Sequence, residues 1–297
     1  MQALLDAIAT LTVPTDAQRV FHGRGGLFPG CEHLTLDAYP PALLLTSFEP
    51  LAEDALAAIG SAITARWPEA PWVYQCRQEG GRTETRLMAG AMPEPHVVTE
   101  AGARYLVHLL RGQNHGLFLD MAEGRRWVRE RVQPGDKVLN LFAYTCAFSV
   151  VALQAGAAEV VNVDMASGAL ATGRTNHELN GVKTGAKFLA HDIFNSWGKL
   201  TRGGPYDLVI CDPPSFQKGS FVATKDYARL ARRLPALLAP GGQALLCLNT
   251  PKLGEAFLRD VVAEQAPELQ FAGRVANPAA FQDQSADRSL KVLAYRL

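Results

Sequence analysis

Residues 137–164 read KVLNLFAYTCAFSVVALQAGAAEVVNVD, and residues 206–216 read YDLVICDPPSF. Three short apolar runs lie in these stretches, at Lys137–Phe142, Val160–Asp164 and Tyr206–Cys211. Runs of this length that are rich in Val, Leu and Ile are typical of strands buried on both faces of a parallel sheet. The small residues of Cys146–Ala155 have the length of a crossover helix, so the pattern predicts a strand–helix–strand unit and an α/β fold.

Acidic residues stand where two of these strands end. Asp164 follows Phe142 by 22 positions, the arrangement in which a carboxylate meets the ribose hydroxyls of an adenosine cofactor. The third strand runs into Asp212-Pro213-Pro214, and the two rings stiffen this turn because each holds φ near about −65°. We expect the turn to hold a carboxylate and an aromatic ring, Phe216, at the carboxyl edge of the sheet, where ligands of open α/β sheets bind.

Six motifs carry a resemblance to a known family. They are GLFLD (116–120), NLFAYT (140–145), DPPSF (212–216), DYARL (226–230), PGG (240–242) and SLK (289–291). In these motifs the chain resembles the class I S-adenosylmethionine-dependent methyltransferases, and more closely the bacterial 23S rRNA large-subunit methyltransferase family that includes cytosine-C-5 and guanine-N-7 enzymes. The resemblance runs roughly from residue 89 to the end of the sequence, and less distinctly through the part before it.

The resemblance implies an α/β fold with a Rossmann-like seven-stranded sheet and a small α+β domain in front of it. We place the accessory domain at residues 1–112 and the methyltransferase domain at residues 113–297. In the first part the sequence predicts a helix at Leu51–Arg66 and three hairpins, which turn at Tyr39–Pro41, Glu79–Arg82 and Ala101–Gly102. In the second part it predicts a helix at Ala223–Ala239 and a closing antiparallel pair.

The resemblance also implies the cofactor, S-adenosyl-L-methionine, which is released as S-adenosyl-L-homocysteine, and no metal. The residues that it implies for cofactor binding are Phe118, Asp120, Arg125, Asn140, Phe142, Ala143, Tyr144, Thr145, Asp164, Met165, Asp192, Ile193 and Asp212. The absence of a G-x-G-x-x-G pattern argues against a pyrophosphate ligand. We expect the amides of the turn to meet the methionyl carboxylate at a helix N-terminus instead.

Two departures from the family pattern concern the expected cofactor site. Family members usually read Thr-Gly-Gly-Phe where this chain has Thr145-Cys146-Ala147-Phe148. Glycine lets a backbone approach a ligand closely, so Cys and Ala strain that approach without excluding it. An arginine usually follows Asp120 by two positions, where this chain has Ala122, although the later arginine is kept as Arg125.

A third departure decides the predicted chemistry. Cytosine-C-5 methylation requires a thiolate that attacks the base, and members with that activity carry Cys where this chain carries Asn249. Cys247 and Cys211 are predicted to lie inside strands. The predicted catalytic residues are Asp212, Pro213, Pro214, Phe216 and Asn249. With no activated thiol, we expect methylation of a nitrogen, which needs only positioning and charge stabilisation.

The composition limits the possible partners and compartments. Net charge is zero, and residues 1–112 carry 8 Lys and Arg against 12 Asp and Glu, so charge alone does not predict nucleic-acid binding. No apolar run approaches the ~20 residues of a membrane span, and the first residues make a poor signal peptide. The five cysteines share no ligand-like spacing, which predicts buried thiols rather than disulfides or zinc. We expect a cytoplasmic protein.

Three further residues or segments leave alternatives open. The glycine-rich stretch Phe21–Gly26 is either a linker between the N-terminal helix and the first strand or a loop that displays His22 and Arg24 to an anionic group. His115 is expected to be exposed in a loop. Lys218 either is solvated or meets a phosphate.

The function that we predict is transfer of a methyl group from S-adenosylmethionine to a base of large-subunit rRNA, with nitrogen favoured. A small-molecule or protein methyltransferase remains an alternative, as does a protein that binds S-adenosylmethionine without catalysis. The sequence predicts neither the target base nor the oligomeric state, which is a monomer or a homodimer.

Overall fold

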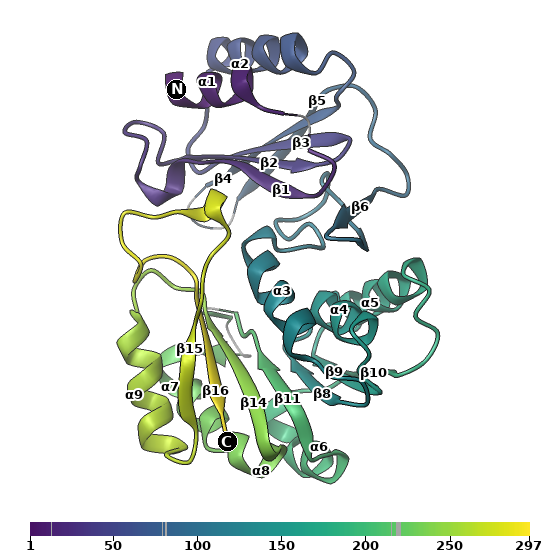
Figure 1. Cartoon of the computed structure of the whole chain (residues 1–297). Coiled ribbons are helices and arrows are strands. Elements are labelled where there is room, and N and C mark those ends of the chain that lie inside the picture. The colour runs from purple at the N-terminus through teal and green to yellow at the C-terminus, as the bar shows by residue number, and fades with distance from the viewer. Residues whose placement is uncertain (13, 79, 81, 215, 218–220) are drawn as a thin grey trace. The chain divides into compact units, whose positions relative to one another are not determined.

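The computed structural model describes residues 1–12, 14–78, 80, 82–214, 216–217 and 221–297. The chain divides into two compact units (Figure 1). One unit comprises Met1–Asp120 with Pro278–Gln284, and the other comprises Met121–Asn277 with Ser285–Leu297. The sequence prediction placed a single boundary after residue 112. The structure has it after Asp120 and returns a late segment to the first unit.

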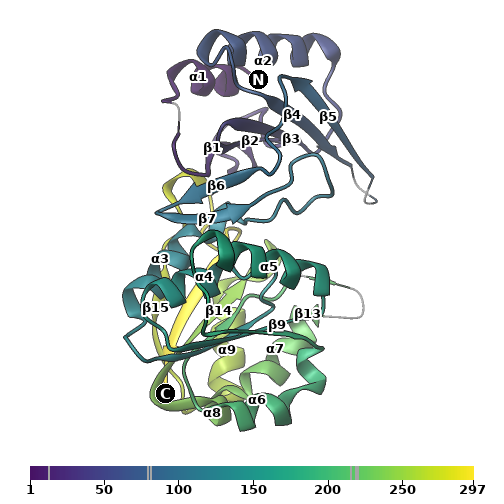
Figure 2. The same cartoon turned by 90° about the vertical axis from the view of Figure 1, so that its right-hand side faces the viewer.

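The first unit is built on a sheet whose described strands run in the order β1-β2-β3-β4-β5. These strands are β1 (Gln18–His22), β2 (Leu34–Tyr39), β3 (Ala42–Ser47), β4 (Trp72–Arg77) and β5 (Thr83–Ala89). Helices α1 (Gln2–Thr10) and α2 (Glu53–Arg66) cover one face of this sheet (Figure 2). Since α2 crosses from β3 to β4, these two strands are parallel, and the other neighbours are antiparallel.

The three hairpins predicted for this unit are present as β2–β3, β4–β5 and the separate pair β6 (Val97–Glu100) and β7 (Ala103–Leu106). Residues 79 and 81 of the second turn lie outside the described residues. The helical face of the sheet is apolar because alternate residues of each strand point to it. The other face carries polar side chains such as Asp37 and Gln75, both buried.

The second unit contains the sheet that the sequence predicts, with seven strands over its described residues, in the order β10-β9-β8-β11-β14-β16-β15. These strands are β8 (Lys137–Leu141), β9 (Glu159–Asp164), β10 (Ala186–Ala190), β11 (Tyr206–Cys211), β14 (Leu238–Leu248), β15 (Gln270–Val275) and β16 (Lys291–Arg296). The first five in the order are parallel, and β16 is antiparallel to both of its neighbours. The short strands β12 (Phe216–Gln217) and β13 (Phe221–Val222) pair separately.

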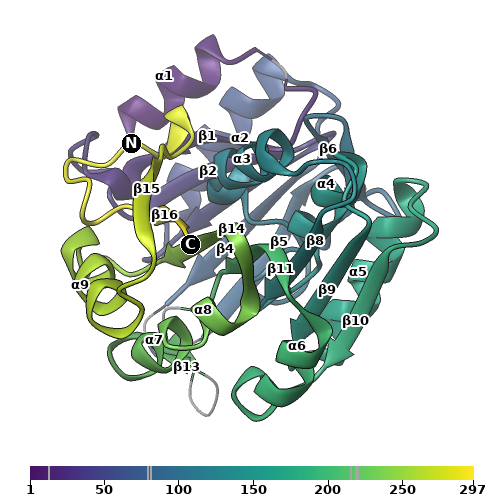
Figure 3. The same ribbon diagram turned by 60° about the horizontal axis from the view of Figure 1, so that its bottom comes forward.

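Helices lie on both sides of this sheet (Figure 3). They are α3 (Ala122–Arg131), α4 (Ala147–Gln154), α5 (Ser167–Leu179), α6 (Trp197–Gly203), α7 (Ala223–Ala231), α8 (Leu234–Leu237) and α9 (Glu255–Gln265). The group α6 to α9 buries a large apolar core against the side chains of one sheet face, which include Leu141, Cys211 and Leu246. This packing explains why the strands read as continuous apolar runs.

The predicted helix Ala223–Ala239 is wrong in its extent. The structure breaks it into α7 and α8, and β14 already begins at Leu238. Pro235 lies in the first turn of α8. A proline has no amide to continue the hydrogen bonding of α7, so the chain starts a new helix there. No helix among the described residues is long and apolar enough to cross a membrane.

Candidate active site

The candidate site lies where the parallel strands of the second unit end. The last rungs of β8, β9 and β11 are in register. Phe142, Asp164 and Asp212 therefore stand in one row at the carboxyl edge of the sheet. Asn249 follows β14, the next strand in the order. The structure thus brings together four residues that span more than a hundred positions of sequence, from Phe142 to Asn249. They lie at the edge where open α/β sheets bind ligands.

The Asp164 carboxylate organises the turn after β8. One oxygen accepts a hydrogen bond of 2.8 Å from the Tyr144 amide, and the other accepts one of 2.8 Å from the Ala166 amide. A carboxylate oxygen has two lone pairs, so each retains the capacity to accept a hydrogen bond from a ligand hydroxyl. The neighbouring side chain, Met165, is 53% exposed. Asp164 can therefore hold the turn and a ribose at once.

Three residues of this turn adopt left-handed backbone conformations. Phe142, Tyr144 and Cys146 have φ values of 58°, 46° and 61°. Residues other than glycine rarely adopt this conformation, and clusters of such strain mark functional sites. The Ala143 and Cys146 amides donate to carbonyls of the protein, at 3.0 and 2.7 Å. The Tyr144 amide donates to the Asp164 carboxylate. All three amides are therefore hydrogen-bonded within the protein, whereas the sequence predicts that the amides of this turn meet the methionyl carboxylate.

The cysteine that replaces a glycine in this turn is accommodated by a glycine on the next helix. Cys146 is fully buried, and a Cβ atom added to Gly173 of α5 would lie 2.6 Å from its sulfur. Asn176, one turn later on α5, donates to the Thr145 carbonyl at 2.9 Å. Helix α5 is thus fitted to the turn by a small residue and a hydrogen bond.

A buried chain of polar side chains, which sequence reasoning missed, lies beneath the turn. Asn140 donates to Asn162, Asn162 donates to Ser149, and the Ser149 hydroxyl is hydrogen-bonded to His177, at 2.9, 2.9 and 2.8 Å. Burial lowers the pKa of His177. The signal in the sequence is a polar residue in the middle of each of two apolar strands. Asn140 was predicted to bind the cofactor; its side chain lies inside the unit, 1% exposed.

Asp192 and Ile193 follow β10, beside the strand that carries Asp164. The Asp192 carboxylate caps the short turn Ile193–Asn195, accepting from the Phe194 amide at 2.9 Å and the Asn195 side chain at 2.6 Å. Ile193 is buried and belongs to the core. The structure therefore gives Asp192 a capping role; its role in cofactor binding stays a prediction.

The Asp-Pro-Pro turn stands at the end of β11. Asp212 is half-buried, and its amide lies 3.4 Å from the Leu141 carbonyl of β8. Pro213 is buried and Pro214 is half-buried. Phe216 belongs to β12, but its side chain, and residues 215 and 218–220 with Lys218 among them, lie outside the described residues.

Asn249 is exposed, whereas the thiols of the chain are not. All five cysteines of the sequence are described; none of them forms a disulfide, and each is buried. Burial raises the pKa of the Cys146 and Cys211 thiols above the ordinary value. A thiol must ionise and reach its target to act as a nucleophile. The prediction that Cys211 and Cys247 lie buried in strands is confirmed.

Three predicted cofactor residues come from the segment that joins the units. Phe118 and Asp120 belong to the first unit, and Phe118 is 41% exposed. Arg125 belongs to α3 of the second unit and is buried. Their gathering around a cofactor stays a prediction.

The glycine-rich stretch of the first unit packs against a late segment of the chain. A side chain at Gly25 would collide with the Gln282 carbonyl. The Phe281 ring lies 5.3 Å from the His22 ring and under the Arg19 guanidinium, at 4.3 Å. The glycines of this stretch therefore allow the segment Pro278–Gln284 to pack closely against it. Arg24 is exposed, so its display to an anionic group stays a prediction.

Two histidines of the first unit are neutral. Arg19 can only donate, so Nδ1 of His22, 2.8 Å away, must accept, and burial lowers the pKa of His22 to about 4. His115 was expected to be exposed, and this is wrong: it is 6% exposed and hydrogen-bonded to Arg77 at 3.1 Å. Its pKa is also lowered by burial.

Comparison with known proteins bears on this site. The family model for S-adenosylmethionine-dependent methyltransferases matches residues 18–296. The Aeromonas salmonicida ribosomal RNA large subunit methyltransferase I is 32% identical over 276 residues, which cover 88% of this chain and 68% of that protein. The ribosomal RNA large subunit methyltransferase K/L of a Psychrobacter species is 36% identical over 186 residues, 60% of this chain and 23% of that protein.

The fold has a counterpart among solved structures. The crystal structure of SMU.776 complexed with SAH superposes with a TM-score of 0.85 at 24% identity, over 100% of this chain and 81% of that one. With the match of the family model over almost the whole chain, and the row of Phe142, Asp164 and Asp212 at the sheet edge, the chain belongs to the S-adenosylmethionine-dependent methyltransferases.

Proposed function

We propose that this protein transfers a methyl group from S-adenosylmethionine to a nitrogen of a base in large-subunit ribosomal RNA. The observation that carries the choice of nitrogen is Asn249, an exposed amide at the end of β14 in a chain whose cysteines are all buried. The substrate class is supported by relatives that are named as ribosomal RNA large subunit methyltransferases. We further propose that the protein acts in the cytoplasm.

The residues at the sheet edge fit the cofactor. Asp164 has a free lone pair on each oxygen for the ribose hydroxyls, and the left-handed turn from Phe142 to Cys146 brings backbone to the edge. Asp192 and Ile193 would border the adenine from the end of β10. The cofactor supplies a methyl group on a positively charged sulfur, which leaves with the electron pair of the broken carbon–sulfur bond.

The chain itself must orient the nitrogen. The Asp212 carboxylate accepts hydrogen bonds, and the Asn249 amide both accepts and donates. Together they can hold an amino or ring nitrogen so that its lone pair points at the methyl carbon. As the new nitrogen–carbon bond forms, positive charge develops on the nitrogen, and a nearby carboxylate stabilises that charge. An amino nitrogen then loses a proton to water, whereas a ring nitrogen without a proton keeps the positive charge. Such positioning and charge stabilisation require no thiol.

The target base must reach the edge of the sheet. A base within a helix has to be turned out of its stack first. We propose that the first unit recognises the shape of the RNA around that base. Proteins recognise double-stranded RNA mostly by its shape, and they read RNA sequence mostly in single-stranded loops and bulges. A chain of zero net charge has no excess of Lys and Arg for phosphate contacts, so this recognition depends on local groups rather than on overall charge.

Labelled methyl transfer tests the proposal. The protein is incubated with radiolabelled S-adenosylmethionine and three separate pools: ribosomal RNA that lacks its methyl marks, total tRNA and extract protein. We expect label in ribosomal RNA. Asp212→Ala should abolish the label while calorimetry still shows cofactor binding. Label in tRNA or protein alone would contradict the substrate, and cofactor binding without label in any pool would favour a small-molecule or non-catalytic function.

A further inference from the structure

The turn that carries Asn249 is held by two buried side chains for which we have no role so far, Tyr227 and Lys291. We propose that both are positioning residues, which fix the Asn249 amide for the target base by binding the backbone on either side of it. This inference rests on the proposed function, since it concerns the same site. Both residues are fully buried.

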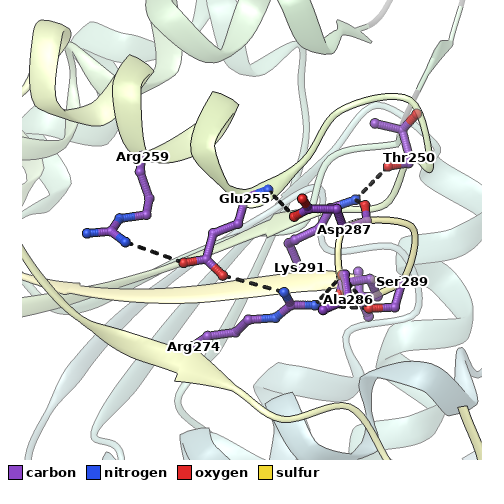
Figure 4. A network of polar contacts seen from close by, with 9 residues as sticks. Thr250, Glu255, Arg259, Arg274, Ala286, Asp287, Ser289 and Lys291 are labelled. Atoms are coloured by element: carbon purple, nitrogen blue, oxygen red, sulfur yellow. Dashed lines mark hydrogen bonds and ion pairs between the residues drawn. The ribbon is translucent and has the colours of Figure 1, made fainter. Parts of the chain in front are cut away.

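Lys291 binds the backbone just after Asn249. It pairs with Leu248 on the last rung between β14 and β16. From there its ammonium group reaches past the end of the strand and donates to the Thr250 carbonyl at 2.6 Å and to the Asp287 carbonyl at 2.8 Å (Figure 4). It thus ties the turn after β14 to the loop before β16.

Tyr227 binds the backbone just before Asn249. Its hydroxyl donates to the Cys247 carbonyl from α7. The carbonyls of residues 247 and 250 are therefore both held by buried donors, and Asn249 lies between them. An exposed side chain on a turn with two such anchors has fewer backbone conformations to lose when it binds a base.

The loop to which Lys291 is tied is itself fixed. The Asp287 carboxylate accepts from the Glu255 amide, at the start of α9, at 3.0 Å. Arg274 donates to the carbonyls of Ala286 and Leu290, at 2.9 and 3.1 Å, and pairs with Glu255 at 3.4 Å (Figure 4). The lysine therefore connects the Asn249 turn to a rigid support rather than to a free loop.

A buried ammonium group at this place points to such a role. Burying a charge is costly, and an apolar side chain of similar size often replaces a buried ion at little or no cost in stability. Lys291→Met should therefore preserve the packing of β16. The variant removes the tie, and the two residues that lose it lie at the surface, Thr250 half-buried and Asp287 exposed. Lys187→Met is the matched control, because that lysine is exposed and pairs with Glu159 on β9.

The experiment compares wild type, Lys291→Met, Tyr227→Phe and Lys187→Met. For Lys291→Met we expect kcat for methyl transfer to fall about 10²-fold, the effect of a small misplacement at a reacting centre, while the dissociation constant of S-adenosylmethionine stays unchanged. Amide hydrogen exchange at Asn249, Thr250 and Lys252 should become faster. Tyr227→Phe should show the same pattern, and Lys187→Met should show none of it.

Hydrogen exchange separates this proposal from the proposed function. If wild type transfers no methyl to RNA, the proposed function fails, and exchange in the Asn249 turn still decides the positioning roles. If Lys291→Met does not fold, Tyr227→Phe tests the same turn from its other side. Wild-type kcat together with wild-type exchange in folded Lys291→Met or Tyr227→Phe would overturn the proposal. A rise in the dissociation constant of S-adenosylmethionine as large as the fall in kcat would also overturn it.

Discussion

At the scale of single residues, we predict that Asp164 decides cofactor binding. Its two oxygens hold the Tyr144 and Ala166 amides, so a replacement by Ala loses both anchors of the turn as well as the group that we propose for the ribose. A hydrogen bond to a charged group contributes about 1.5–3 kcal/mol. We expect Asp164→Ala to raise the dissociation constant of S-adenosylmethionine by about 10- to 100-fold, measured by calorimetry.

The same sheet offers a matched control. Asp207, at the opposite end of β11, accepts from the Lys137 amide at 2.8 Å, as Asp164 accepts from an amide at the carboxyl edge. Asp207→Ala should lower the melting temperature without changing cofactor affinity. An affinity loss shared by both variants would show that Asp164 acts only through the stability of the sheet.

At the scale of elements, α5 is fitted to the cofactor turn through Gly173. A methyl group there would meet the Cys146 sulfur at 2.6 Å. Such overpacking costs about 1–3 kcal/mol, so Gly173→Ala should lower the free energy of unfolding in urea by that amount. Cys146→Gly removes the sulfur, and glycine adopts the left-handed φ of 61° at this position without strain. We expect it to rescue Gly173→Ala in a double-mutant cycle.

The control lies on the same helix. A Cβ at Gly168 of α5 would meet nothing within 4 Å, so Gly168→Ala should be neutral or stabilise the protein by up to about 1 kcal/mol. A loss of stability for Gly168→Ala equal to that for Gly173→Ala would show that α5 rejects side chains for another reason. Additive effects of Cys146→Gly and Gly173→Ala would also contradict the fit.

At the scale of the whole molecule, three buried histidines and the half-buried His22 set the response to acid. Burial lowers the pKa of His22 to about 4, and it lowers the pKa of His96, His115 and His177. In the folded state these groups stay neutral to a lower pH than in the unfolded chain, where they bind protons below about pH 6.5. Stability is therefore full above pH 6.5 and falls as the pH drops, for His22 until about pH 4.

Urea unfolding at pH 7.5 and pH 5 tests this pH dependence, and His22→Gln should reduce it. Glu53 and Glu159 have lowered pKa values, so their contribution to stability is lost only as the pH falls below their ordinary pKa of 4.5. The histidines therefore dominate the change in stability between pH 7.5 and pH 5. Equal stability at both pH values, or greater stability at pH 5, would contradict neutral histidines in the folded state.

Much of this molecule follows from local sequence pattern. Apolar runs gave the strands, and the acids and prolines that end them gave the sheet edge with Asp164 and Asp212. Long-range contacts escaped prediction: residues 278–284 join the first unit, and Tyr227 and Lys291 hold a turn far from them in sequence. No periodicity reports such contacts, because they depend on which side chains meet after folding. Pro235 is a local signal for the break between α7 and α8, and the prediction of one long helix did not take it into account.

The central claim is that this methyltransferase modifies a nitrogen, with Asn249 in place of a thiol. The most direct measurement is mass spectrometry of nucleosides from ribosomal RNA methylated by the protein with S-adenosylmethionine that carries a deuterated methyl group. We predict a nucleoside with the heavy methyl group on nitrogen, and its loss with Asp212→Ala. A heavy C-5-methylcytidine would contradict the account, because it requires a thiolate that no buried cysteine here provides.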